Sequence, residues 1–254
     1  MSGKRKPLGI GRLIVLIICA IVFCGCLAYL GMWLKDNISE QKDFREISQK
    51  MHEKDTGLED IYALNKDVVG WITIEDTRID YPVMQSVDDP EYYLHRDFNR
   101  AYSESGTPFL DAKSRVGDQP TWNWFIYAHN MKYGSMFHDL LEYDSSDFRD
   151  SHSIVGLQII TGVKNGRPVI EKGEYEVFAA ARSKIRDRNS GAFKYYEYAG
   201  FDDEKSFNRY IRGVKKEALY DTGITPEFGD QLITLSTCAY HTDNGRFYIV
   251  AVKR

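Results

Sequence analysis

The chain has 254 residues, of which 43 % are hydrophobic and 13 % aromatic, enough to build a buried core and to exclude a disordered or low-complexity protein. Its 33 Lys and Arg against 37 Asp and Glu give a net charge of -4, which argues against a nucleic-acid-binding protein. The charge is unevenly placed, because Lys4, Arg5, Lys6 and Arg12 all precede the first acidic residue, Asp36. A basic tip therefore precedes a net acidic body.

The first predicted element is a membrane-spanning helix over Leu13–Leu34. Its 22 residues carry no charge and would span about 33 Å as a helix, enough to cross a hydrocarbon core of roughly 30 Å. A cleaved signal peptide would have a shorter apolar core that ends in small residues, and Phe23-Cys24-Gly25 matches poorly the small residues expected before a lipoprotein cleavage at Cys26. By the positive-inside rule, residues 1–12 form a cytoplasmic tip, and everything after Lys35 lies outside the cell.

Two further regions follow this anchor. Residues 35–57 are polar with Phe44, Ile47 and Met51 at helical spacing, which predicts a stalk or linker helix. Residues 58–254 form the predicted extracytoplasmic domain, which opens with a short second helix from Leu58.

The rest of the domain is rich in short β-branched and aromatic runs separated by turn residues. We predict strands at Val69–Ile74, Arg78–Met84, Thr107–Asp111, Trp122–Ala128, Ile154–Thr161, Glu174–Arg182, Gln231–Thr237 and Arg246–Val252. The first two read as a hairpin. Helices are predicted at Ser135–Leu141 and Lys205–Leu219. Many short strands with little helix between them predict an all-β-dominated domain, a closed barrel or a sandwich.

Cys238 is the one cysteine outside the apolar segment. An intramolecular disulfide in the exterior domain is therefore impossible, and a lone exterior thiol is at risk of oxidation unless it is buried or takes part in chemistry. Cys238 ends the apolar strand Gln231–Thr237, which would give the thiol a rigid support at the edge of a loop. On this evidence alone, Cys238 is equally well interpreted as a nucleophile or as a buried structural cysteine.

Two histidines are candidates for the base that would deprotonate this thiol. His129 ends the apolar strand Trp122–Ala128, and His241 lies three residues after Cys238. Either imidazole could reach the thiol, although an isolated histidine at a strand end is more often structural.

Arg246 is a candidate for a different role, a positive charge beside the thiol. It follows the turn Asn244-Gly245, and a hairpin of the last two strands would bring it back to Cys238. A guanidinium there would favour the thiolate and stabilise a developing oxyanion. The sequence does not single out an acidic residue that would complete the candidate site; Asp111 and Asp243 are weak candidates.

Taken together, these residues resemble the sortases, membrane-anchored cysteine transpeptidases of Gram-positive bacteria. Thr234–Cys238 (TLSTC) is similar to the family's TLxTC motif, Arg246 to its downstream arginine, and Tyr127–Asn130 (YAHN) to its histidine-bearing strand end. The resemblance covers roughly Leu58 to the C-terminus. It is strongest to class B, on the two leading helices, the hairpin of residues 71–83, the segment 131–137 and the helix Lys205–Leu219.

The resemblance implies a closed barrel of about eight strands, with N-terminal helices and a long helix before the penultimate strand. It also implies that Cys238 cleaves a C-terminal sorting motif of secreted proteins through a thioester, with His129 as acid and base and Arg246 stabilising the oxyanion. Ser236 and Thr237 would contribute to the substrate groove. The acceptor would be an amine of peptidoglycan or its lipid-linked precursor. The sequence has no metal-ligand cluster or phosphate loop, so no essential cofactor is expected.

Two other functions fit parts of the pattern. An exported cysteine peptidase or amidase would release its product to water, although papain-like enzymes place the nucleophile at the start of an early helix, unlike Cys238. A non-catalytic anchored domain that binds cell-wall polymer would tolerate Cys238→Ala without loss of function.

Overall fold

The structure is a computed structural model that describes residues 10–54, 56–187 and 189–254, without the side chains of residues 34–41. The first nine residues of the predicted cytoplasmic tip lie outside the described residues. In chain order the elements are α1 (Ile10–His52), α2 (Leu58–Leu64), β1 (Val68–Thr73), β2 (Asp80–Met84), η1 (Tyr92–His95), β3 (Phe109–Leu110), β4 (Asn123–Tyr127), η2 (His138–Asp144), α3 (Ser146–Ser151), β5 (Ile154–Lys164), β6 (Arg167–Lys184), η3 (Tyr195–Tyr198), α4 (Glu204–Glu217), β7 (Leu232–Cys238) and β8 (Gly245–Lys253).

The chain divides into two compact units, Met1–Asp43 and Phe44–Arg254. The described part of the first unit is helical and includes Ile10–Trp33, a stretch of 24 residues with a mean hydropathy of 3.0 and no buried residue. By length and composition this stretch is able to cross a membrane, and it contains nearly all of the span predicted at Leu13–Leu34.

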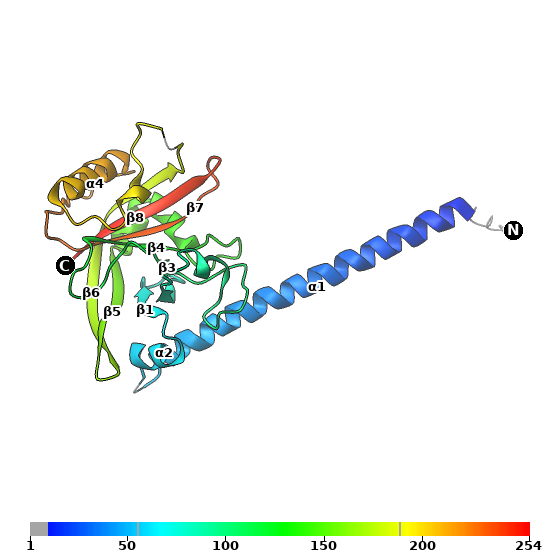
Figure 1. Cartoon of the computed structure of the whole chain (residues 1–254). Helices are drawn as coiled ribbons and strands as arrows, with labels where there is room; N and C mark the ends of the chain where they lie inside the picture. The colour runs from blue at the N-terminus through cyan, green and yellow to red at the C-terminus, as the bar shows by residue number, and fades with distance from the viewer. Residues whose placement is uncertain (1–9, 55, 188) are drawn as a thin grey trace. The chain divides into compact units, whose positions relative to one another are not determined.

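The second unit is built on a closed barrel with the strand order β1-β2-β3-β4-β7-β8-β6-β5 (Figure 1). The described residues thus contain the eight strands that the sequence predicted, and β1 and β2 form the expected hairpin. Two pairings are parallel: β2 with β3, and β4 with β7. The β4–β7 pairing matters for the site because it brings the carboxyl ends of both strands to the same edge of the sheet.

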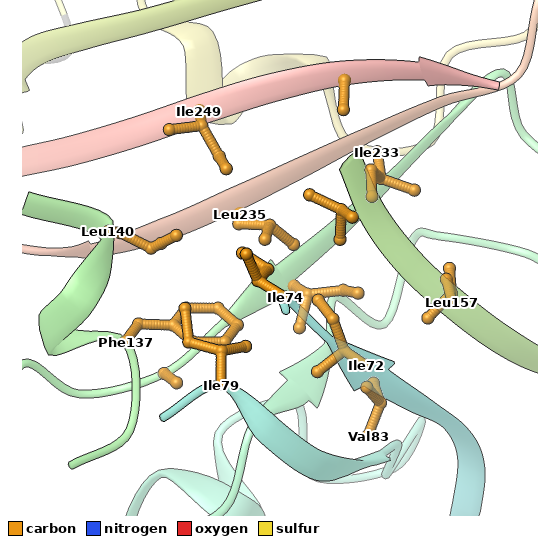
Figure 2. Packing of buried hydrophobic residues seen from close by; sticks show 14 of the residues in the cluster. Ile72, Ile74, Ile79, Val83, Phe137, Leu140, Leu157, Ile233, Leu235 and Ile249 are labelled. Atoms are coloured by element: carbon orange, nitrogen blue, oxygen red, sulfur yellow. The ribbon is translucent and has the colours of Figure 1, made fainter. Parts of the chain in front are cut away.

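Side chains on the two strands β7 and β8 alternate between two cores. Ile233, Leu235 and Ile249 point into the barrel interior, where they join residues of β1, β2, β5 and η2 (Figure 2). Leu232 and Val250 belong instead to a second cluster outside the barrel wall. Since successive residues of a strand face opposite sides, this period of two explains why every residue of the run LITL, Leu232 to Leu235, is buried.

The second cluster is covered by α4, which lies beside the barrel in Figure 1. Its apolar face consists of four buried residues at helical spacing: Phe207, Tyr210, Ile211 and Val214. Asp203 caps the helix by accepting a hydrogen bond from the Ser206 N–H at 2.9 Å. The predicted long helix before the penultimate strand is therefore confirmed.

A third cluster closes the end of the barrel near α2. Met51, from the end of α1, and Leu58 and Ile61 of α2 pack there with Trp71 of β1. The Trp71 indole donates a hydrogen bond to Asp80 at 2.7 Å, which ties β1 to β2 beneath the helices.

Several predicted elements have other bounds in the structure, and two of these differences have a clear cause in the backbone. The expected helix Ser135–Leu141 is instead the 3-10 helix η2, three residues later, because Met136 has a positive φ of 58° that no helix accommodates. The strand expected at Glu174–Arg182 is the longer β6, Arg167–Lys184. Asn165 and Gly166 both have positive φ and form a tight turn, so that the first half of β6 pairs with β5 along its whole length.

Candidate active site

Cys238 and Arg246 face each other across the β7–β8 hairpin. They are partners in the antiparallel register, and the loop between them is closed by the Ala239 N–H, which donates to the Gly245 carbonyl at 3.0 Å. Directly opposed residues project to the same face, with Cβ atoms about 4.5–5.5 Å apart. The predicted return of Arg246 to Cys238 is confirmed.

His129 reaches the same place from the neighbouring strand. It follows β4, whose last residue Tyr127 pairs with Ser236 in the parallel register. The strand ends are held together beyond that pair, because the Thr237 hydroxyl donates to the Ala128 carbonyl at 2.8 Å. His129 is thereby set beside the end of β7 that carries Cys238.

The His129 ring is oriented by a backbone carbonyl. Its Nε2 lies 2.9 Å from the Leu94 oxygen, and because a carbonyl only accepts, Nε2 carries the hydrogen. The other ring nitrogen, Nδ1, is left to exchange a proton with a ligand. Burial lowers the pKa of His129 below the usual histidine value; the Leu94 carbonyl acts in the opposite direction, and His95 and Arg246 add to the lowering.

All three side chains line one pocket of about 330 Å³. Each of them is partly buried, so each is held by the protein yet open to the pocket. Aromatic and aliphatic side chains form the adjoining walls, among them Tyr195 and Ile185. A thiol, an imidazole and a guanidinium that converge on one cavity constitute the groups needed for acyl transfer through a cysteine.

Comparisons with known proteins agree with this chemistry. No family model matches the chain. Over 194 residues the chain is 36 % identical to sortase B of Listeria monocytogenes, an alignment that spans 76 % of this chain and 72 % of that protein. The chain belongs to the sortase B family. Membership makes it a cysteine transpeptidase.

Solved structures of sortase B share the fold. The sortase B–substrate complex of Staphylococcus aureus gives a TM-score of 0.72 at 24 % identity, over 87 % of this chain and 98 % of that one. Sortase B of Listeria monocytogenes gives 0.61 at 34 % identity, over 77 % and 99 %. Sortase B of Clostridium perfringens gives 0.63 at 28 % identity, over 77 % and 98 %.

The sequence predicts that Ser236 and Thr237 contribute to the substrate groove. Both residues border the pocket, but they are only 1 % and 2 % exposed. The Ser236 hydroxyl lies 2.7 Å from the Tyr195 hydroxyl, and Thr237 bonds to Ala128 as described. In the structure both hydroxyls connect β7 to neighbouring segments. Their contact with a substrate stays a prediction.

The weaker sequence candidates lie in different places. His241 and Asp243 are exposed in the β7–β8 loop and are not among the described residues that line the pocket. Asp111 does border the pocket, where its carboxylate accepts a hydrogen bond from the Lys113 N–H at 2.8 Å. The geometry therefore favours His129 over His241 as the partner of Cys238.

Sequence reasoning missed a polar support for the backbone of Cys238. The Asn130 amide donates to the Cys238 carbonyl at 3.1 Å, and its own oxygen accepts from His138 Nδ1 at 2.7 Å. Asn130 directly follows His129, so its place at a strand end was a usable signal. His138 is eight residues away on η2, and no local pattern indicates that contact.

Across the described part of the chain, no group of three or more His, Cys, Asp or Glu side chains is arranged to hold a metal ion.

Proposed function

We propose that Cys238 is the nucleophile of this transpeptidase, His129 its acid and base, and Arg246 its oxyanion-stabilising residue. The observation that carries the proposal is the convergence of the three side chains on one pocket, with Cys238 and Arg246 as register partners and His129 at the parallel strand end beside them. The substrate would be a C-terminal sorting motif of a secreted protein.

In the first step the Cys238 thiolate attacks the carbonyl carbon that follows the motif's threonine. The C–N bond breaks, His129 donates a proton to the leaving amine, and an acyl-enzyme thioester remains. Arg246 opposes the negative charge that develops on the carbonyl oxygen. Dividing the acyl transfer into two steps lowers each barrier relative to direct aminolysis of the amide.

In the second step an amine of peptidoglycan, or of its lipid-linked precursor, attacks the thioester carbon. Neutral His129 accepts the proton of the incoming amine, the C–S bond breaks and the thiolate is restored. The new amide joins the secreted protein to the wall component. Proton and electron pair balance over the cycle without a cofactor.

The anchor completes the proposal. The stretch Ile10–Trp33 would hold the enzyme in the cell membrane as a single-pass protein, and the basic tip before it would keep the N-terminus cytoplasmic. Donor and acceptor would then meet at the outer face of the membrane. In protoplasts, an external protease should digest a C-terminal tag but not an N-terminal one; protection of the C-terminal tag would overturn this orientation.

The test of function uses the full chain in detergent micelles. A panel of sorting-motif peptides is incubated with and without an amine nucleophile, and products are identified by mass spectrometry, beside Cys238→Ala, His129→Ala and Arg246→Ala. We expect amine-ligated peptide with the wild type and its loss in all three variants. Hydrolysis that added amine does not divert would indicate a peptidase. Ligation that survives Cys238→Ala would overturn the proposal.

A further inference from the structure

A second imidazole lies against the candidate acid and base. The ring centroids of His95 and His129 are 5.3 Å apart with an angle of 34° between the ring planes. On the other side of His95, the Tyr102 ring is stacked at 6.3 Å and 20°. Tyr102, His95 and His129 therefore form a column of three rings that begins at the exposed surface and ends in the pocket.

The position of His95 is fixed by the backbone around η1. The Ser103 N–H donates to the His95 carbonyl at 3.2 Å, and Arg96 and Tyr102 form an isolated antiparallel bridge. Gly106 packs so closely on this segment that a Cβ at its position would lie 2.3 Å from the Leu94 oxygen. That same oxygen is the hydrogen-bond acceptor of His129. One short segment thus presents two successive residues to the His129 ring, a carbonyl and an imidazole.

The charged and titratable groups around His129 come from several elements. His95 approaches from η1, Arg246 from β8 and Cys238 from β7, while Glu91 and Asp111 border the same pocket. His95 and Arg246 act in the same direction, because a positive charge on either opposes a positive charge on His129. Of these two, His95 is the one whose ring contacts the His129 ring.

We propose that His95 is a positioning residue for His129: its ring holds the His129 ring by direct contact, and a positive charge on it opposes a positive charge on His129. This inference rests on the proposed role of His129. A positive charge on one imidazole disfavours a positive charge on an imidazole in contact with it. His95 would thereby keep His129 neutral, and able to accept the proton of the incoming amine, at lower pH than an isolated histidine in the same pocket.

The first readout does not depend on catalysis. The full chain, labelled with carbon-13 at histidine Cε1 and held in nanodiscs, gives up to six ring signals for its six histidines. His129→Gln assigns the signal of interest, which is then followed against pH. Two variants remove the charge: His95→Phe keeps an aromatic ring, and His95→Gln keeps a polar side chain. His152→Phe, which preserves a ring stacked on Phe148 away from the pocket, is the matched control.

We expect the titration midpoint of His129 to rise in both His95 variants and to stay unchanged in the control. For a unit charge 5.3 Å away in a solvent-like dielectric, the rise is about half a pH unit. The acid limb of the aminolysis rate should move to higher pH by the same amount. The proposal is overturned if the titration midpoint of His129 rises in neither His95 variant while the other histidine signals stay unchanged.

The two hypotheses fail in different ways. If His129→Gln still ligates amine, the proposed role of His129 is wrong, whatever the midpoint does. If His129→Gln is inactive and the midpoint does not respond to His95, the catalytic role stands and the positioning role falls.

Discussion

Cys238 and Arg246 are partners in the antiparallel register of β7 and β8, so that eight residues of sequence return the guanidinium to the side of the thiol. This pairing needs no long-range docking, since a single hairpin fixes both groups. His129, by contrast, depends on the parallel pairing of β4 with β7 across more than one hundred residues. The site therefore combines one local and one long-range relationship.

The first prediction concerns the geometry of the cation. Arg246→Ala should lower kcat/KM for peptide ligation by about 10²–10³-fold, as the loss of an oxyanion donor does in other enzymes. Arg246→Lys should retain only part of the wild-type kcat/KM, because an ammonium group lacks the planar set of N–H donors of a guanidinium. Arg115→Ala removes an exposed arginine that pairs with Asp202, and should leave kcat/KM unchanged. Equal activity of Arg246→Ala and wild type would remove Arg246 from the mechanism.

The second prediction separates the two candidate histidines. His129→Ala should lower kcat/KM by about 10²–10⁴-fold, the usual contribution of a general acid and base. His241→Ala should retain wild-type kcat/KM because its side chain is exposed and outside the pocket lining. Steady-state ligation kinetics on both variants decide the assignment. The reverse pattern would identify His241 as the base.

The third prediction concerns pH. Burial lowers the pKa of His129, so the neutral ring persists below the ordinary histidine value of about 6.5. In the acyl-enzyme the thiol is consumed, and the rate of aminolysis should fall only when the pH drops through that lowered pKa. The measurement uses preformed acyl-enzyme and a weakly basic amine that does not itself titrate in the range. A midpoint above about 7 would contradict the assignment.

The fourth prediction tests the hairpin that holds the pair together. A Cβ on Gly245 would lie 2.1 Å from the Ala239 carbonyl oxygen, a backbone atom that cannot turn away. Gly245→Ala should therefore lower the free energy of unfolding by about 1–3 kcal/mol and reduce kcat/KM as Arg246 shifts from Cys238.

The matched control for that change is Gly162→Ala in β5, where a Cβ meets no atom within 4 Å. Thermal unfolding followed by near-ultraviolet circular dichroism, together with ligation rates, compares the two variants. Wild-type stability and rate in Gly245→Ala would show that the hairpin end is not as closely packed as described.

Much of the fold could be predicted from local pattern. The apolar runs of β7 and β8 are strands because they are covered on both faces, and Phe207, Tyr210, Ile211 and Val214 mark the buried face of α4 by their spacing alone. Where prediction erred, a backbone angle decided the outcome. Met136 interrupts the expected helix with its positive φ, and the Asn165-Gly166 turn lengthens β6.

The three candidate catalytic residues could be named from the sequence because each lies at or next to the end of a strand, a position that sequence reveals. The groups that orient the trio could not. Leu94 and His95 act on His129 from η1, a short element in a polar segment, through a backbone oxygen and a ring contact. A carbonyl is the same in every residue, so sequence carries no sign of it.

The most direct test of the account is the covalent intermediate. Full-length enzyme in detergent is mixed with a sorting-motif peptide without amine, quenched in acid within seconds and analysed by intact and peptide-level mass spectrometry. We predict an adduct of the N-terminal peptide fragment on Cys238 that hydroxylamine releases, as a thioester requires, and that is absent from Cys238→Ala. Turnover of the peptide with no adduct on Cys238, or an adduct on any other residue, would contradict the central claim.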